Sequence, residues 1–238
     1  ESVEKQTQPM APCSEMGYGK FTFTLRELLA DTSTPPGHIV EGGILVPGGI
    51  TLIHGKPKTR KSFLAIQLGM HLAGGTPWLG FKIPQPKRVL YVQAELTYHA
   101  MRSRVYQMSA RLMEGKNTSN LMVTERFQKR IDNPDEYNSI KKMIEGVNVD
   151  VIIIDPLVYF HGSSENSNDE MGKVMSSFRS LVDETGTSLV LVHHDGKSFE
   201  LSGGDASRGA SAIFGAVDTD VHIGTESSKG PYHTHQEL

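Results

Sequence analysis

Residues 50–73 read ITLIHGKPKTRKSFLAIQLGMHLA, and no other stretch of the chain says as much about the fold. The opening ITLIH is short, apolar and rich in β-branched side chains, which is typical of a buried strand. From Ser62 onward, apolar residues recur at helical spacing. Between the two, GKPKTRKS nearly matches the phosphate-binding pattern GxxxxGK[ST]. The order of strand, loop and helix therefore predicts a P-loop.

A P-loop holds a nucleotide with several groups at once. Its backbone N–H groups surround the β-phosphate, and the positive end of the next helix points at the same anion. Lys61 is placed to bridge the outer phosphates, and the Ser62 hydroxyl to reach Mg²⁺. We expect ATP to contact the whole loop: Gly55, Lys56, Pro57, Lys58, Thr59, Arg60, Lys61, Ser62 and Phe63. Taken alone, the loop also fits a lysine-rich surface turn without a ligand.

Arg60 is the departure from the pattern, because it stands where a second glycine is expected. If that position requires a positive φ, a non-glycine residue there costs about 1–2 kcal/mol, which a tight anion site can offset. The backbone N–H is retained, so the loop keeps its donors. The guanidinium then either turns outward to solvent or adds a positive charge near the phosphates.

The remainder of the chain alternates short apolar runs with segments of helical period. Expected strands are ITLIHG (50–55), RVLYVQAE (88–95), LMVTE (121–125), DVIIIDPL (150–157) and TSLVLVHH (187–194). Expected helices cover 98–113, 134–147 and 170–186. Strands that are apolar at nearly every position are buried on both faces, as in a parallel sheet covered by helices. The pattern predicts an α/β fold with a mainly parallel central sheet flanked by helices on both faces.

Two of these strands end in a carboxylate. Asp155 ends the run DVIIID and can hold water on Mg²⁺ opposite the Ser62 hydroxyl. Glu95 follows VLYVQA at the strand edge where open α/β sheets bind ligands, so it is placed to orient and activate an attacking water. A buried strand ending in Asp is common, and Glu95 also fits a helix-capping acid.

Paired histidines end another strand, LVLVHH. Adjacent imidazoles on a strand point to opposite faces, so His193 and His194 make a poor chelating pair. One of them is better suited to hydrogen-bond the γ-phosphate or the attacking water. His233 and His235 share a face and could contact a metal, although two histidines on an exposed strand need no ligand.

Arg208 lies in ASRGASAIFGAVD, at the start of an expected helix of small residues. An arginine delivered to a neighbouring subunit's γ-phosphate stabilises the charge of the phosphoryl-transfer transition state, and a ring of subunits delivers it. A surface arginine beside a glycine-rich loop is the alternative interpretation.

Composition narrows the class of protein. The chain has 238 residues, 37% of them hydrophobic, which suits the core of one substantial domain. Its formal net charge of −3 shows no overall basic excess, so any nucleic-acid contact must be local. No apolar run has the length of a membrane span, and the first residues lack a signal-peptide layout. The single cysteine, Cys13, favours a reducing compartment, so we expect a cytoplasmic location.

The chain divides into three expected parts. Residues 1–20 are rich in Pro, Gln, Ser and Glu and form a flexible polar leader. Residues 21–48 form a lead-in segment, with a helix-like FTLRELLADT followed by Gly and Pro turns. The nucleotide-binding domain then occupies residues 49–238, and its C-terminal end can be incomplete.

Together these motifs resemble the RecA-like ATPase core, and in particular the RepA-like branch of hexameric replicative helicases. The resemblance extends over residues 38–224. It rests on these stretches, in this order: IVEGGILVPGGITLIHGKPKTRKS, YVQAEL, IIIDPLVYFHGSSENSNDEM, LVLVHHDGK and ASRGASAIFGAVD. The motifs are specific only in combination.

The resemblance implies ATP and Mg²⁺ as cofactors, with Ser62 and Asp155 on the metal. The implied catalytic residues are Glu95, Lys61, His193 or His194 as a sensor, and Arg208 acting in trans. It also implies a homo-oligomeric ring, usually a hexamer, that threads single-stranded DNA and works with primase or other replication proteins.

Loops 161–169 and 195–207 are the candidates for contacting that DNA. The first is acidic and matches phosphate poorly, whereas the second offers Lys197 and Ser198, with Phe199 as the only ring for stacking.

Three functions remain in order of preference. The first is an ATP-driven DNA helicase or translocase. The second is a switch or assembly protein of the same fold that hydrolyses ATP slowly, because Arg60 replaces the loop glycine, and recruits partners. The third is an interaction module whose basic turn only mimics a P-loop.

Overall fold

The structure is a computed structural model that describes residues 22–195 and 210–224. The chain separates into two compact units, Glu1–Pro36 and Gly37–Leu238. In the first unit, helix α1 (Leu25–Ala30) begins with a capping box. The Thr24 hydroxyl accepts a hydrogen bond from the Glu27 backbone N–H, and the Glu27 carboxylate accepts one from the Thr24 backbone N–H.

A sheet of six parallel strands forms the centre of the second unit, within the part of the chain that the structure describes. The strands follow the order β3-β2-β4-β5-β1-β6 across the sheet. Their bounds are β1 Ile50–Gly55, β2 Val89–Gln93, β3 Leu121–Val123, β4 Val151–Asp155, β5 Ser188–His194 and β6 Thr219–Ile223. Because the strands are parallel, their carboxyl ends meet at one edge of the sheet.

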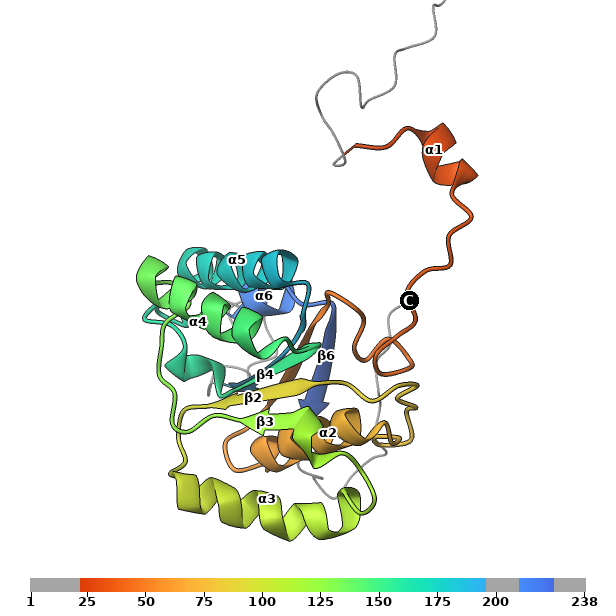
Figure 1. Ribbon diagram of the computed structural model, residues 1–238. Helices are drawn as coiled ribbons and strands as arrows, with labels where there is room; N and C mark the ends of the chain where they lie inside the picture. The colour runs from red at the N-terminus through yellow and green to blue at the C-terminus, as the bar shows by residue number, and fades with distance from the viewer. Residues whose placement is uncertain (1–21, 196–209, 225–238) are drawn as a thin grey trace, which may run out of the picture. The chain divides into compact units, whose positions relative to one another are not determined.

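Helices cover both faces of this sheet (Figure 1). One face carries α2 (Lys61–Gly74) and α3 (Tyr98–Leu112). The other carries α4 (Pro134–Val147), α5 (Asn168–Thr185) and α6 (Ala210–Phe214). Short 3₁₀ turns lie at Thr118–Asn120 and Leu157–Tyr159. The predicted α/β class, with a parallel sheet between helical layers, is confirmed.

Strand residues alternate between two apolar cores. Leu52 packs in the core under α4 and α5, whereas its neighbour Ile53 packs in the core under α2 and α3. Each strand from β1 to β5 except the short β3 is buried along nearly its whole length. This explains why the sequence shows continuous apolar runs in place of alternation.

Local patterns predicted several boundaries well and missed one strand. Strand β1 and helix α4 have the predicted bounds. Strand β6 was not predicted, because its burial alternates and it lies at the sheet edge beside β1, where polar residues such as Asp220 stay partly exposed. The second compact unit begins at Gly37, and Val40 and Leu45 at the end of the lead-in segment are fully buried in its core.

Among the described residues, no helix is both long enough and apolar enough to cross a membrane.

Candidate nucleotide-binding site

The loop between β1 and α2 leaves the sheet through Gly55 and enters the helix at Lys61. Gly55 has φ 154°, and a Cβ there would lie 2.3 Å from the carbonyl oxygen of Ile223 in β6. Only glycine fits this close approach of two backbones. The neighbouring strand β6 therefore fixes the residue type at the start of the loop.

Arg60 is the N-cap of α2 and has a left-handed backbone, with φ 67° and ψ 26°. The positive φ expected at this position is thus present, and the cost of about 1–2 kcal/mol for a non-glycine residue applies. The Arg60 side chain makes no capping hydrogen bond and is exposed. Lys58 also has a positive φ, of 68°. Because two residues of one short loop adopt a strained backbone, the conformation of the backbone itself is the feature that the loop maintains.

That backbone presents a group of donors. Among the described residues, no hydrogen-bond partner is found for the backbone N–H groups of Lys58, Arg60, Lys61 and Ser62. The last two belong to the first turn of α2, whose N–H groups carry the positive end of the helix. A nest of unpaired N–H groups at a helix N-terminus suits a phosphate.

The Lys61 side chain lies inside the loop. Its ammonium group donates to the carbonyl oxygens of Gly55 and Lys56, each at 2.7 Å. Burial lowers the pKa of Lys61, while the carboxylates of Asp195 and Asp155 act in the opposite direction. The ammonium is therefore held by the loop itself and must exchange these carbonyl oxygens for any phosphate oxygens.

Ser62 and Asp155, the two predicted metal ligands, are in direct contact. The Ser62 hydroxyl donates to Asp155 Oδ1 at 3.1 Å. Tyr91 in β2 donates its hydroxyl to the other carboxylate oxygen in a short hydrogen bond. Burial raises the pKa of Asp155, and the hydrogen bonds from Tyr91 and Ser62 partly oppose this. The site offers hard oxygen ligands, which Mg²⁺ prefers.

Glu95 follows the end of β2 at the same edge of the sheet. Its backbone is fixed on both sides, since its N–H donates to the Gln93 side chain at 3.1 Å and its carbonyl accepts from Arg126 at 2.9 Å. Burial raises the pKa of Asp155 and lowers the pKa of His194, and the charge of the Glu95 carboxylate adds to the first shift and opposes the second. Glu95 is exposed, so its carboxylate is open to a water molecule.

The paired histidines point to different neighbours, as adjacent strand residues must. His194 lies opposite Gly55 across the β1–β5 ladder, and its pKa is lowered by burial and by the charge of Lys61. His193 is buried against the other face, with its Nδ1 3.8 Å from Glu165. His194 is therefore the imidazole beside the nucleotide loop.

Comparison with known families agrees with this geometry. The family model described as an AAA domain matches residues 19–200, which include the loop, Glu95, Asp155 and both histidines. The chain belongs to the AAA domain family. It is accordingly a P-loop ATPase domain that binds nucleotide, and ATPases of this kind usually use Mg²⁺.

This AAA domain has a pocket of about 350 Å³ beside the loop. The pocket is lined by Thr59, Arg60, Phe63, Leu64, Gln67, Met108 and Ile223. The Arg104 guanidinium lies 4.4 Å from the centroid of the Phe63 ring. This cation–π contact holds the Phe63 ring, which forms one wall of the pocket. The outward guanidinium of Arg60 thus borders a space next to the phosphate donors.

Part of the predicted site of the AAA domain falls outside the described residues. These positions are Arg208, His233, His235 and the loop from 196 to 207. Of the two expected DNA loops, 161–169 is described, and its Glu165 lies 3.7 Å from His161 and 3.8 Å from His193.

Sequence reasoning missed Tyr91 and Asp195. A hydroxyl inside the apolar run VLYV was the available signal for Tyr91. Asp195 directly follows the paired histidines, and nothing in the local pattern indicates its partners.

Proposed function

We propose that this AAA domain is an ATP-hydrolysing motor of the RecA and RepA type, which assembles into a ring and moves along single-stranded DNA during replication. The contact between Ser62 and Asp155, next to Lys61 and the unpaired N–H groups, is the observation that carries the proposal. It supports the proposal because the expected Mg²⁺ ligands would lie directly beside the expected phosphate donors, as a metal-bound triphosphate requires.

Each residue of the site has a role in this proposal. Lys61 leaves the carbonyl oxygens of Gly55 and Lys56 and binds the outer phosphates. Ser62 and Asp155 hold Mg²⁺, which neutralises charge that develops on the phosphate oxygens. The exposed Glu95 carboxylate orients the attacking water and accepts its proton.

Two further residues connect the site to the assembly. His194, held beside Lys61 and Glu95, hydrogen-bonds the γ-phosphate or the attacking water and so distinguishes ATP from ADP. Arg208 acts on the nucleotide of the adjacent subunit, which is why the proposal includes a homo-oligomeric ring, with six subunits by resemblance. DNA binding is local, in keeping with the net charge of −3.

A second function of the same site is a slow ATPase switch that recruits replication or recombination partners. Arg60 favours this alternative, because a bulky charged residue at φ 67° borders the pocket where the pattern has glycine. The exposed Glu95 also favours it, since no described residue hydrogen-bonds its carboxylate and fixes it for catalysis.

Measuring ATP turnover with and without single-stranded DNA separates these functions. The parent chain is compared with Lys61→Ala and with Lys142→Ala, an exposed lysine on the outer helix α4. Turnover that DNA stimulates strongly and that only Lys61→Ala abolishes supports the motor. Slow, unstimulated turnover with tight ATP binding supports the switch. Absence of nucleotide binding in the parent chain contradicts both.

A further inference from the structure

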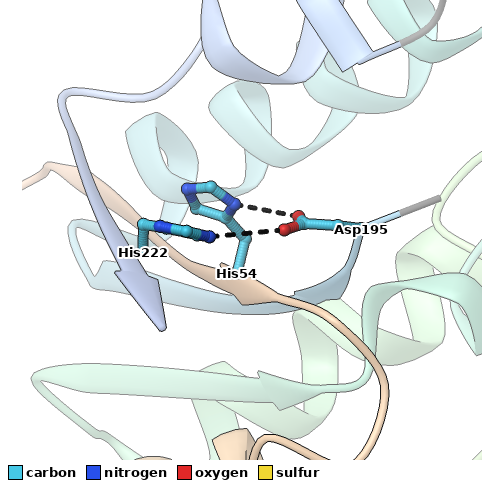
Figure 2. Close-up of side chains that lie close together, drawn as sticks. All are labelled: His54, Asp195 and His222. Carbon is cyan, nitrogen blue, oxygen red and sulfur yellow. Dashed lines mark hydrogen bonds and ion pairs between the residues drawn. The ribbon is translucent and has the colours of Figure 1, made fainter. Parts of the chain in front are cut away.

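A second group of polar side chains lies behind the nucleotide loop, on the other face of the sheet. It consists of His54 at the end of β1, Asp195 directly after β5, and His222 in β6. The His54 ring packs edge-on against Phe214 of α6, with 4.9 Å between the ring centroids, whereas the loop continues into α2 on the opposite face. Figure 2 shows both imidazoles turned toward the Asp195 carboxylate.

The distances within this group suit a shared ligand. His54 Nδ1 lies 2.9 Å from Asp195 Oδ1, and His222 Nε2 lies 3.7 Å from Asp195 Oδ2. One ligand atom from each residue can be chosen so that all lie within 4.8 Å of one another. Tetrahedral Zn²⁺ with bonds near 2.0–2.1 Å places its ligand atoms about 3.4 Å apart. The two separations above, measured from different oxygens of the Asp195 carboxylate, lie on either side of that value, and the three-atom set stays within 4.8 Å.

Asp195 supplies an independent indication of a ligand. Its side chain is only 3% exposed, yet Oδ2 accepts no hydrogen bond from any described residue. A buried carboxylate oxygen without a donor is costly, and such atoms in native proteins generally have a partner. His222 Nε2 lies 3.7 Å from this oxygen, which is too far for a hydrogen bond.

Asp220 completes the arrangement from the edge strand. Its Oδ2 lies 3.3 Å from His54 Nε2, the ring nitrogen that points away from Asp195. A carboxylate that accepts from one imidazole nitrogen directs the lone pair of the other nitrogen toward a metal, as in carboxylate–histidine–metal groups. Here the nitrogen directed at the metal would be Nδ1, which lies 2.9 Å from Asp195 Oδ1.

We propose that His54, Asp195 and His222 bind one transition-metal ion of the Zn²⁺ class, with Asp220 positioning His54 from behind. Two imidazoles and one carboxylate select such an ion over Mg²⁺, which prefers oxygen ligands. The ion ties the ends of β1, β5 and β6 together. It does so directly behind the nucleotide loop, because the Asp195 backbone N–H donates to the Gly55 carbonyl at 3.0 Å.

Calorimetric titration with ZnCl₂ tests this site. The full chain is stripped of metal with EDTA, dialysed, and titrated without nucleotide and without Mg²⁺, so the result does not depend on the proposed ATPase activity. The parent chain should bind one tight equivalent of Zn²⁺. His222→Ala should weaken that binding by at least tenfold, and Asp220→Asn by about 10–100-fold. Both residues are half exposed, so the variants should fold, which circular dichroism checks.

Matched controls identify the site. His99→Ala removes an exposed histidine on α3 and should leave Zn²⁺ binding unchanged. A double variant, His233→Ala with His235→Ala, should also retain the tight equivalent. The proposal is overturned if the parent chain shows no saturable binding, which would make the group a hydrogen-bonded imidazole and carboxylate cluster only. It is equally overturned if binding survives His222→Ala or disappears in the double variant.

Discussion

The Ser62 hydroxyl donates a hydrogen bond to Asp155 across 3.1 Å, although the two residues are 93 positions apart in the chain. Ser62 stands in the first turn of α2, and Asp155 is the last residue of β4. The contact brings the end of the phosphate loop to the carboxylate expected to hold Mg²⁺.

Asp155→Asn should reduce Mg²⁺-dependent ATP turnover by more than about 100-fold, because a bound metal supplies several kcal/mol of transition-state stabilisation. It should not destabilise the nucleotide-free protein. Burial raises the pKa of Asp155, so the folded state retains this proton to higher pH than the unfolded state. In the parent, the contribution of Asp155 to the free energy of unfolding therefore falls as the pH rises from 3.8, the usual Asp pKa, to the raised pKa of the folded state. Thermal unfolding of both forms across this pH range should show the decline only in the parent; a less stable variant at pH 7 would contradict the argument.

Tyr91→Phe should weaken the support of Asp155 while leaving the core filled. Loss of a hydrogen bond to a buried carboxylate costs about 1–3 kcal/mol of unfolding free energy. The pKa of Asp155 should rise further, because the Tyr91 hydrogen bond lowers it. The pH at which Mg²⁺-dependent turnover reaches half of its maximum should then move upward. Tyr106→Phe, on an exposed ring of α3, is the control and should change neither quantity.

Arg60→Gly should stabilise the nucleotide-free protein by about 1 kcal/mol, because it removes the strain of a left-handed arginine. Nucleotide affinity should stay similar or increase, since the backbone N–H is unchanged. Chemical denaturation and ATP titration measure the two effects. Asn148→Gly, at φ 48° after α4, is the control and should leave nucleotide affinity unchanged. A large loss of turnover in Arg60→Gly would make the guanidinium a participant in catalysis.

Glu95→Gln should lower the turnover number by about 10²–10⁴-fold, as expected for a general base, with little effect on ATP affinity. The side chain is exposed and its backbone contacts are retained, so folding should be unaffected. Glu125→Gln, an exposed carboxylate after β3, provides the comparison and should keep normal turnover. Equal turnover in both variants would assign the water-activating role to another residue.

Much of the fold followed from local pattern. The apolar runs of β1 and β4 marked buried strands, and the spacing of apolar residues in α4 predicted its bounds. Strand β6 was missed because this edge strand alternates polar and apolar residues and has no continuous apolar run. The expected acids of the site were recognisable because Asp155 ends the apolar run of β4 and Glu95 closely follows the apolar run of β2.

The roles of the histidines could not be assigned in this way. Alternation along β5 predicted that His193 and His194 diverge, but which one faces the nucleotide loop depends on the register with β1, where His194 lies opposite Gly55. The group of His54, Asp195 and His222 comes from strands that are neighbours only through β-sheet pairing.

The amino-acid order thus specifies the strand, loop and helix of the nucleotide site and the acids that follow two strands, because periodicity and turn chemistry act over a few residues. The tertiary structure decides which of these side chains contact one another. Burial of both sheet faces under helices sets the strand order, and that order brings Tyr91 to Asp155, and His222 to His54, across distances in sequence that no local preference spans.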